Sequence, residues 1–441
     1  MTAVTKTPVQ VTLTTPRRLK AVLAALLAAT GIFWLAAESE ISRVRASVQT
    51  IGKDSVPSIV AAEDIRVLLA RANVHAIQAT AGPPADAQEA WRLHDLDMAA
   101  AADRLVTAAQ NITYGDDERV PILKILDGMN VYAREVGVAR AESGVRARAH
   151  LRDATRILRG DVLTQAEALD HANFAHLDSE YARAQSSASG GLVGAGLALI
   201  VTFAAAQIWL ARRFRRVLSL PIAIGMLVIL GVFMQELLLL GRSRELMKVA
   251  KADAFDSIHA LSRARATAFD AASDEAFYLL DGAAEDEQAF EQRCSALAYG
   301  SLDDATLRSI ACGGRGGLSG YIADELANIT FEGEREQALA MARSWRAVTV
   351  AHQEACEVVR HGKAPVVAIR CGPASTLGSA FEEFDGALVA TLKTNQSAFD
   401  RAVGDAVTEL DGLPGPLAFA SVLLALLSWL GVRARLREYA E

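Results

Sequence analysis

Residues 191–240 read GLVGAGLALIVTFAAAQIWLARRFRRVLSLPIAIGMLVILGVFMQELLLL, two long apolar runs joined by the basic linker ARRFRR. Each run is close to the ~20 residues that a helix needs to cross about 30 Å of hydrocarbon. Similar runs stand near the two ends of the chain. The sequence therefore predicts four transmembrane helices, at residues 21–37, 188–211, 217–240 and 414–432.

Lysine and arginine flank these helices in three clusters, in residues 1–20, 212–216 and 433–441. Segments rich in Lys and Arg remain in the cytoplasm, so both termini and the linker are predicted to be cytoplasmic. No convincing small-residue cleavage site follows Ala37, and we expect the first helix to be kept as an uncleaved anchor.

The rest of the chain forms two blocks, residues 38–187 and 241–413, which this topology places outside the cytoplasm. With 51% hydrophobic residues the chain is more apolar than a soluble protein, yet it is too charged to lie in the membrane throughout. The formal charge is −7, and the cytoplasmic segments hold eleven cations and two acids, which leaves about −16 on the remainder. An acidic exterior argues against nucleic acid or anionic lipid as the ligand.

Both blocks have the composition of helices, rich in Ala, Leu, Arg, Glu and Asp. Breaks at residues 82–84, 114–117 and 142–144 divide the first block into four helices, of which the outer two run directly into membrane helices. The predicted fold class is an all-α membrane protein, in which four transmembrane helices carry two tandem extracytoplasmic four-helix bundles.

The second block repeats short segments of the first. Asn111-Ile112-Thr113-Tyr114 recurs as Asn328-Ile329-Thr330-Phe331, and ADAQEAW at residues 85–91 has a counterpart, AEDEQAF, at residues 284–290. The two offsets are 217 and 199, so about 18 residues are inserted between these segments in the second copy. We interpret Thr113 and Thr330 as helix caps, because acidic residues that suit a helix N-terminus follow each of them.

All four cysteines, Cys294, Cys312, Cys356 and Cys371, fall in the second block. An even number on the oxidising side of a membrane predicts two disulfides. Of the three possible connectivities we favour Cys294 with Cys312 and Cys356 with Cys371, since each pair closes a short loop. A metal site that includes His352 is the alternative, but the spacing lacks a CxxC unit and we predict no metal there. We expect the pairs to staple an elaborated tip of the second bundle, either to hold long loops or to dock a partner.

No arrangement of residues predicts an enzyme. The chain has no HExxH sequence, nucleophile elbow or phosphate loop, so we expect no catalytic residue and no cofactor. Arg66 and Arg71 are candidates to hold a ligand carboxylate, and the alternative is that they pair with local acidic residues. The linker arginines either contact a cytoplasmic partner or only set the topology: Arg212, Arg213, Arg215 and Arg216.

The stretch Ile51–Ile59 (IGKDSVPSI), the Asp64-Ile65-Arg66 that follows and the two Asn-Ile-Thr-aromatic segments resemble the GlnX family, in a likeness of layout that covers essentially the whole chain. Members of that family are integral membrane partners of the GlnH solute-binding lipoprotein and of protein kinase G. The bundles are also similar in architecture to the sensory domains of bacterial chemoreceptors. The resemblance implies a bacterial cytoplasmic membrane, an external binding protein that captures aspartate or a related amino acid, and a cytoplasmic serine/threonine kinase as effector.

The expected function is a transmembrane sensor-adaptor that relays amino-acid availability to this kinase. Two alternatives remain open at this point: a receptor that binds the small molecule directly, and a structural envelope protein that does not signal. The sequence leaves monomer and homodimer equally open.

Overall fold

The computed structural model describes residues 15–82, 84–186, 190–214, 218–311, 314, 317–361 and 376–438. These residues form α-helices interrupted by π-helical segments, and no β-strand is present among them. The all-helical class is therefore confirmed. The chain divides into two compact units, which are described separately: unit 1 comprises residues 1–48, 182–246 and 404–441, and unit 2 comprises residues 49–181 and 247–403.

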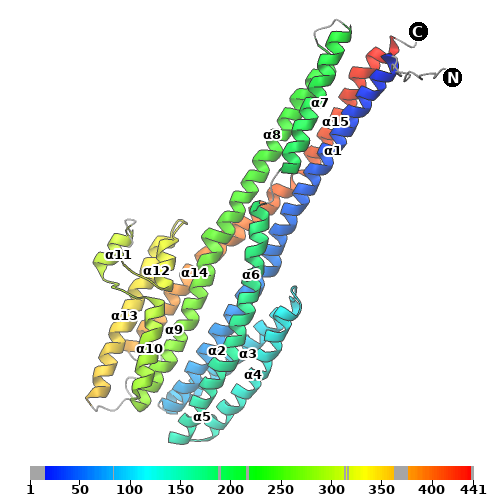
Figure 1. The fold of residues 1–441 in the computed structure, drawn as a ribbon. Helices are drawn as coiled ribbons and strands as arrows, with labels where there is room; N and C mark the ends of the chain where they lie inside the picture. Colours follow the sequence, from blue (N-terminus) through cyan, green and yellow to red (C-terminus); the bar gives the residue numbers. More distant parts are fainter. Residues whose placement is uncertain are drawn as a thin grey trace, which may run out of the picture. The chain divides into compact units, whose positions relative to one another are not determined.

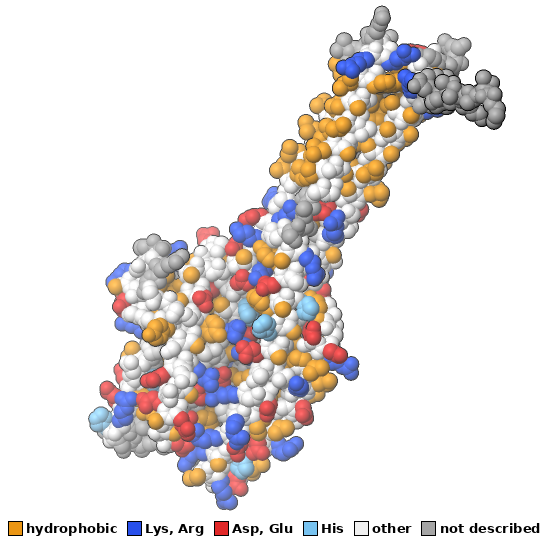
Figure 2. Space-filling view, viewed as in Figure 1, with side chains coloured by type: hydrophobic (Ala, Val, Ile, Leu, Met, Phe, Trp, Pro, Cys, Tyr) orange, Lys and Arg blue, Asp and Glu red, His pale blue; other side chains and the backbone are white. Residues whose placement is uncertain are grey.

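Unit 1 contains the helices that were predicted to span the membrane (Figure 1). The structure has four helical stretches long and apolar enough to cross a membrane, in agreement with the sequence. Large apolar side chains are exposed on them, among them Ile32, Val201 and Leu227 at 60%, 64% and 71%, which suits contact with lipid (Figure 2). The helices are α1 (Thr15–Gln49), α7 (Gly190–Phe214), α8 (Leu220–Lys248), α15 (Pro414–Arg437) and the last part of α14 (Thr376–Asp411).

Glycine allows close packing between the helices of unit 1. A Cβ atom on Gly196 of α7 would come within 2.4 Å of the Phe233 ring on α8, and one on Gly225 of α8 within 2.8 Å of the Phe203 ring on α7. Gly194, in contrast, has nothing within 4 Å of its Cβ position. Gly196 therefore packs against a neighbouring helix, whereas Gly194 does not.

Residues from the three predicted cytoplasmic segments meet at one end of unit 1. The Arg213 guanidinium donates a hydrogen bond of 2.9 Å to Thr15 at the start of α1. Arg435, near the end of α15, lies over the Phe214 ring at 5.4 Å. The end of α7, the start of α1 and the end of α15 thus lie together, as expected if all three segments face the same side of a membrane.

Unit 2 contains both blocks of the sequence. The helices of the first block begin and end at the predicted breaks, and a positive φ of 68° at Gly115 and 60° at Gly144 marks two of them. The first block consists of η1 (Thr50–Ser55), α2 (Val56–Ala81), α3 (Pro84–Gln110), α4 (Asp116–Ala141), α5 (Gly144–Ile157), η2 (Leu158–Leu163) and α6 (Thr164–Ser186). The second consists of η3 (Val249–Phe255), α9 (Asp256–Asp281), α10 (Ala284–Leu297), α11 (Asp304–Ala311), α12 (Tyr321–Ala327), α13 (Glu334–Arg360) and α14.

The insertion predicted in the second block appears as three helices, α10, α11 and α12, in place of the single helix α3. The expectation that it elaborates the same end as the α13–α14 turn is wrong. α10 packs against α9, and its 14 residues carry the chain about 20 Å back along that helix. Asn328, directly after α12, donates hydrogen bonds to the carbonyls of Ala252 and Asp253 in η3, so the insertion ends beside the start of α9 (Figure 1).

The interpretation of Thr113 and Thr330 as helix caps is also wrong. Each hydroxyl donates back to the carbonyl of the asparagine two residues earlier. The free backbone N–H groups before α4 and α13 are satisfied by glutamates instead: Glu118 Oε2 accepts from Thr113 N and Tyr114 N, and Glu334 Oε2 accepts from Thr330 N and Phe331 N. The carboxylate reaches back over the turn and accepts from both N–H groups, as the glutamate of a capping box does.

Each block has its own apolar core, and the two blocks pack together. Ile65, Leu69 and Tyr132 are buried in the first core, whereas Trp345 and Phe384, with ring centroids 4.8 Å apart, are buried in the second. A third buried cluster joins α2 to α9: Val67, Ala70, Val74, Ala266 and Phe269. The blocks are therefore parts of one compact unit, which sequence periodicity did not predict.

Candidate functional site

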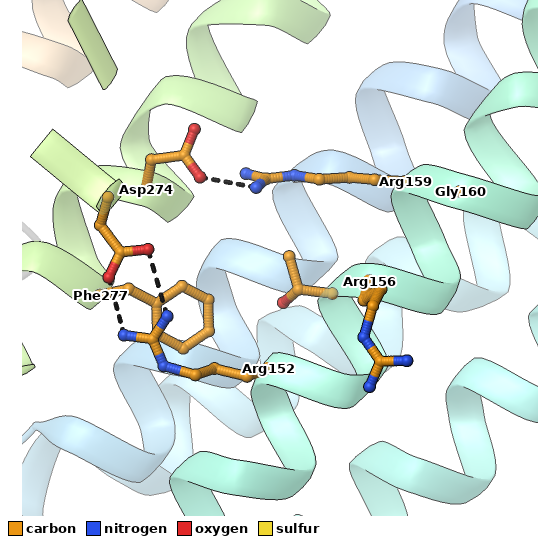
Figure 3. Close-up of a pocket in the computed structure, with 8 residues that line it drawn as sticks. Arg152, Arg156, Arg159, Gly160, Asp274 and Phe277 are labelled. Atoms are coloured by element: carbon orange, nitrogen blue, oxygen red, sulfur yellow. Dashed lines mark hydrogen bonds and ion pairs between the residues drawn. The ribbon is translucent and has the colours of Figure 1, made fainter. Parts of the chain in front are cut away.

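A cavity of about 370 Å³ lies within unit 2 between α5 and η2 of the first block and α9 and α10 of the second. Figure 3 shows arginines from the first block reaching toward carboxylates from the second. Three guanidinium groups and two carboxylates thus surround a partly apolar space. The lining residues are Arg152, Thr155, Arg156, Arg159, Gly160, Asp274, Phe277 and Asp286.

Arg159 forms the most buried ion pairs of this cavity. Its Nη1 lies 2.6 Å from Asp274 Oδ1 and its Nε lies 3.3 Å from Asp270 Oδ1. Asp274, whose side chain is 3% exposed, also accepts from Arg293 Nε at 2.5 Å. Burial disfavours the charged form of Arg159, but Asp270 and Asp274 outweigh it and raise the pKa of Arg159.

Arg152 holds the other side of the cavity. Its Nη2 lies 2.7 Å from Asp286 Oδ2 and 2.9 Å from Asp281 Oδ2, and its guanidinium lies 4.4 Å above the Phe277 ring. The hydrogen bond to Asp286 raises the pKa of Arg152 most strongly, so this group stays charged. Arg156 differs, because its side chain is 74% exposed and pairs with Asp153 on its own helix.

The cavity combines both signs of charge with an aromatic wall, and its volume lies in the lower range of small-molecule sites. Such a lining suits a small zwitterion, since guanidinium groups bind a carboxylate and Asp274 and Asp286 would accept from an ammonium group. A ligand would have to rearrange the existing ion pairs, and the free energy needed to break them would lower its affinity.

Arg66 and Arg71, the candidates from sequence, lie on α2 and do not line this cavity. Arg66 Nη1 lies 2.9 Å from Glu63 Oε1, and Arg71 Nε donates to Asp97 Oδ2 at 2.9 Å, with a second contact between the same side chains. Both side chains are partly buried, at 14% and 30% exposed. Each guanidinium therefore has an intramolecular carboxylate, which a ligand carboxylate would have to displace.

A buried ionic cluster joins α2, α6 and α9. His259 Nε2 lies 3.0 Å from both oxygens of Asp170 and 3.9 Å from Glu63 Oε1. These three residues are close enough to hold a metal ion. However, Arg66 and Arg263 act on Glu63 and supply the positive charge that a metal would bring, so we interpret the cluster as an ion network. Burial raises the pKa of Glu63 to about 7.

The favoured disulfides stay a prediction, because Cys312 and Cys371 lie outside the described residues. Cys294 and Cys356, which the structure describes, are not bonded to one another. Cys356 Sγ lies 3.2 Å from His352 Nε2, and His352 Nδ1 lies 2.5 Å from Glu275 Oε1. Of the linker arginines, Arg212 and Arg213 end α7, while residues 215 and 216 lie outside the described residues.

Comparison with known proteins bears on the first block of unit 2. Residues 47–182 match a family of known sensors. The family is the actinobacterial sensor domain. The matched range runs from the end of α1 through η1 and α2 to α6. No curated protein and no solved structure matches the chain.

The sensor domain and the four membrane-spanning candidates together indicate a sensory membrane protein. Sequence reasoning missed the cavity that the sensor domain forms with the second block. Its one available signal is the spacing of Arg152, Arg156 and Arg159 at three and four residues, which places them on one face of a helix. The acidic partners of Arg152 and Arg159 come from more than 110 residues further along the chain, and no local pattern identifies them.

Proposed function

We propose that this chain is a transmembrane sensor-adaptor without enzymatic activity of its own. The observation that carries the proposal is the sensor domain at residues 47–182, flanked by helices long and apolar enough to span a membrane. In this proposal the signal is passed to a separate cytoplasmic protein.

In this proposal the second block is a tandem copy of the sensor domain. Its support is structural: the same asparagine, glutamate and serine positions make the same contacts at the turn before α4 and at the turn before α13. A π-helical segment also precedes both α2 and α9. Each sensor module would be connected to the membrane by its own helices. A signal could therefore cross the membrane through either module.

Helical continuity supports a mechanical relay. Helical structure runs without a break from Thr15 to Ala81 and from Leu220 to Asp281, and each run contains a π-helical segment. Such segments mark places where a helix shifts register, and small shifts of a helix past its neighbours transmit signals through a membrane.

The partners in this proposal are an extracytoplasmic solute-binding lipoprotein that captures an amino acid of the aspartate or glutamate class, and a cytoplasmic serine/threonine kinase. The resemblance to the GlnX family supports both. The linker arginines, with Arg212 and Arg213 at the end of α7, are the proposed cytoplasmic contact. The membrane is the bacterial cytoplasmic membrane, with both termini inside.

The test uses the full chain in lipid nanodiscs, titrated with aspartate alone and with an aspartate-loaded solute-binding lipoprotein from the same cell. The adaptor predicts binding of the loaded lipoprotein and no binding of free aspartate. Absence of any interaction with the loaded lipoprotein would contradict it. An exchange of Arg212 and Arg213 for glutamine should leave lipoprotein binding intact but lower kinase activity in cells, provided that membrane topology is preserved.

A second candidate, direct binding of the amino acid, is favoured by one observation, the cavity lined by Arg152, Arg159, Asp274 and Asp286. It predicts binding of free aspartate by the full chain without any lipoprotein. Arg156→Gln should weaken that binding while leaving the fold unchanged, because the ion pair that it removes is with Asp153 on the same helix.

A further inference from the structure

Two fully buried carboxylates stand next to one another in the second block without a basic partner. Glu325 on α12 and Glu334 at the start of α13 are both 0% exposed. Neither forms an ion pair with any side chain in the described ranges of the chain. A buried carboxylate without a compensating charge is strongly unfavourable, so this pair requires a cation or a proton.

Three side-chain oxygens at this place lack a hydrogen-bond donor. Glu325 Oε2, Glu334 Oε1 and Asn395 Oδ1 are all buried and have no partner. Asn395, on α14, is itself 0% exposed, and its Nδ2 lies 3.4 Å from Glu325 Oε1. All three atoms, which come from three helices, are oxygens of the hard type that Ca²⁺ and Mg²⁺ prefer.

The electrostatics of Glu325 agree with this geometry. Burial and the neighbouring Glu334 together raise the pKa of Glu325 to about 7, against the opposing effect of hydrogen bonds from the Ser257 hydroxyl and Asn395. The main influences on this carboxyl group include no lysine or arginine. This contrasts with the Glu63 cluster, where Arg66 and Arg263 already balance the carboxylates.

The first block provides an internal control, because it has the same turn without the second carboxylate. Asn111 N donates to the carbonyl of Ala108, just as Asn328 N donates to the carbonyl of Glu325. Glu118 takes the place of Glu334, and Asn173 that of Asn395, with the same hydrogen bond to a carbonyl one turn earlier. The two turns therefore differ in one position, where the first block has Ala108 and the second has Glu325.

We propose that Glu325, Glu334 and Asn395 bind one hard divalent cation of the Ca²⁺ class, which ties α12, α13 and α14 together in the second block alone. The cation neutralises both carboxylates and satisfies the three free oxygens. It fixes the inserted segment, α10 to α12, to the rest of the block. The site rests on side chains of this chain and is independent of the proposed signalling partners.

The test is calorimetric titration of the chelator-treated full chain in detergent with CaCl₂, with MgCl₂ and MnCl₂ in parallel, at pH 7.5. We expect one cation per chain with a dissociation constant on the order of 10⁻⁴ M, and a melting temperature that rises with the cation. Glu325→Ala, which gives the second block the residue of the first, and the isosteric Glu325→Gln should each weaken binding at least tenfold. Glu118→Gln should bind as the unmodified chain does.

The variants also separate loss of the site from loss of the fold. Without the cation, Glu325→Gln should melt at a higher temperature than the unmodified chain, since it removes the repulsion between the two carboxylates. If the unmodified chain and Glu325→Gln bound the cation with equal affinity, the proposal would be overturned. The cation would then bind to acidic side chains on the protein surface. No binding of any of the three cations would also overturn it, and a fall in stability toward pH 7 that Glu325→Gln abolishes would then assign a shared proton to the pair.

Discussion

Asn111 and Asn328, 217 residues apart, make the same hydrogen bonds at equivalent turns of the two blocks. Asn111 Nδ2 donates to the Asp54 carbonyl in η1 at 3.0 Å and to Ser58 Oγ at 2.8 Å. Asn328 Nδ2 donates to the Asp253 carbonyl in η3 at 3.1 Å and to Ser257 Oγ at 2.9 Å. In both blocks, therefore, one asparagine fastens the turn between two helices to the π-helical segment of another.

Replacement of either asparagine by alanine should destabilise the protein. Asn328→Ala leaves carbonyl groups of η3 without a donor, and we expect a loss of about 1 to 3 kcal/mol in the free energy of unfolding, measured by urea denaturation in detergent. Asn111→Ala should behave alike, and the two losses should add because the residues share no partners. Thr330→Ala serves as a control with little expected effect, since that hydroxyl is exposed and bonds only locally.

The ion pairs of Arg159 should contribute strongly to the packing of the two blocks. Arg159→Ala leaves Asp270 and the buried Asp274 with only Arg293, and we expect a destabilisation of about 3 kcal/mol. Arg156→Ala, three residues earlier on the same face, should change stability by less than about 0.5 kcal/mol. Equal effects of the two variants in urea denaturation would show that the buried network contributes nothing.

Stability should depend on pH through Glu63. Its pKa is about 7 in the folded protein against an ordinary value of 4.5, so the folded state holds the proton more tightly. The resulting stabilisation is complete below about pH 4.5 and is lost as the pH rises to 7, by up to about 3 kcal/mol. Glu63→Gln should flatten this slope in urea denaturation between pH 5 and pH 8, whereas the exposed Glu354→Gln should leave it unchanged.

The packing of α7 against α8 depends on the absence of a side chain at Gly196. Gly196→Leu would drive a side chain into the Phe233 ring, and we expect a loss of about 1 to 3 kcal/mol, seen as a lower melting temperature in detergent. Gly194→Leu, with open space around its Cβ position, is the matched control and should melt as the unmodified chain does. Similar melting temperatures for the two variants would show that α7 and α8 do not pack closely at Gly196.

Much of the fold was predictable because it is local in sequence. Apolar runs of ~20 residues identified the four candidate spans, and Gly115 and Gly144 lie at breaks that the sequence placed correctly. The repeated Asn-Ile-Thr segments pointed to equivalent turns, although their glutamates rather than their threonines satisfy the backbone. A glutamate that reaches back four residues looks, in sequence, like any acidic residue that starts a helix.

The contacts between the blocks were not predictable in this way. The pairing of Val67 and Val74 on α2 with Phe269 on α9 depends on two helices that lie almost 200 residues apart in the chain. Likewise, Glu325 and Asn395 are ordinary polar residues in sequence, and only the fold of unit 2 brings the Asn395 amide nitrogen next to the Glu325 carboxylate. Burial of a polar group is a property of the assembled core, which a single sequence does not reveal.

The central claim is that the chain relays the state of an external binding protein to a cytoplasmic kinase. Crosslinking of the intact protein in its native membrane, with and without aspartate, followed by mass spectrometry of the crosslinked peptides, tests it most directly. The account predicts crosslinks from unit 2 to a solute-binding lipoprotein that change with aspartate, and crosslinks from Arg212 and Arg213 or their neighbours to a serine/threonine kinase. Recovery of envelope-assembly proteins alone, unchanged by aspartate, would contradict it.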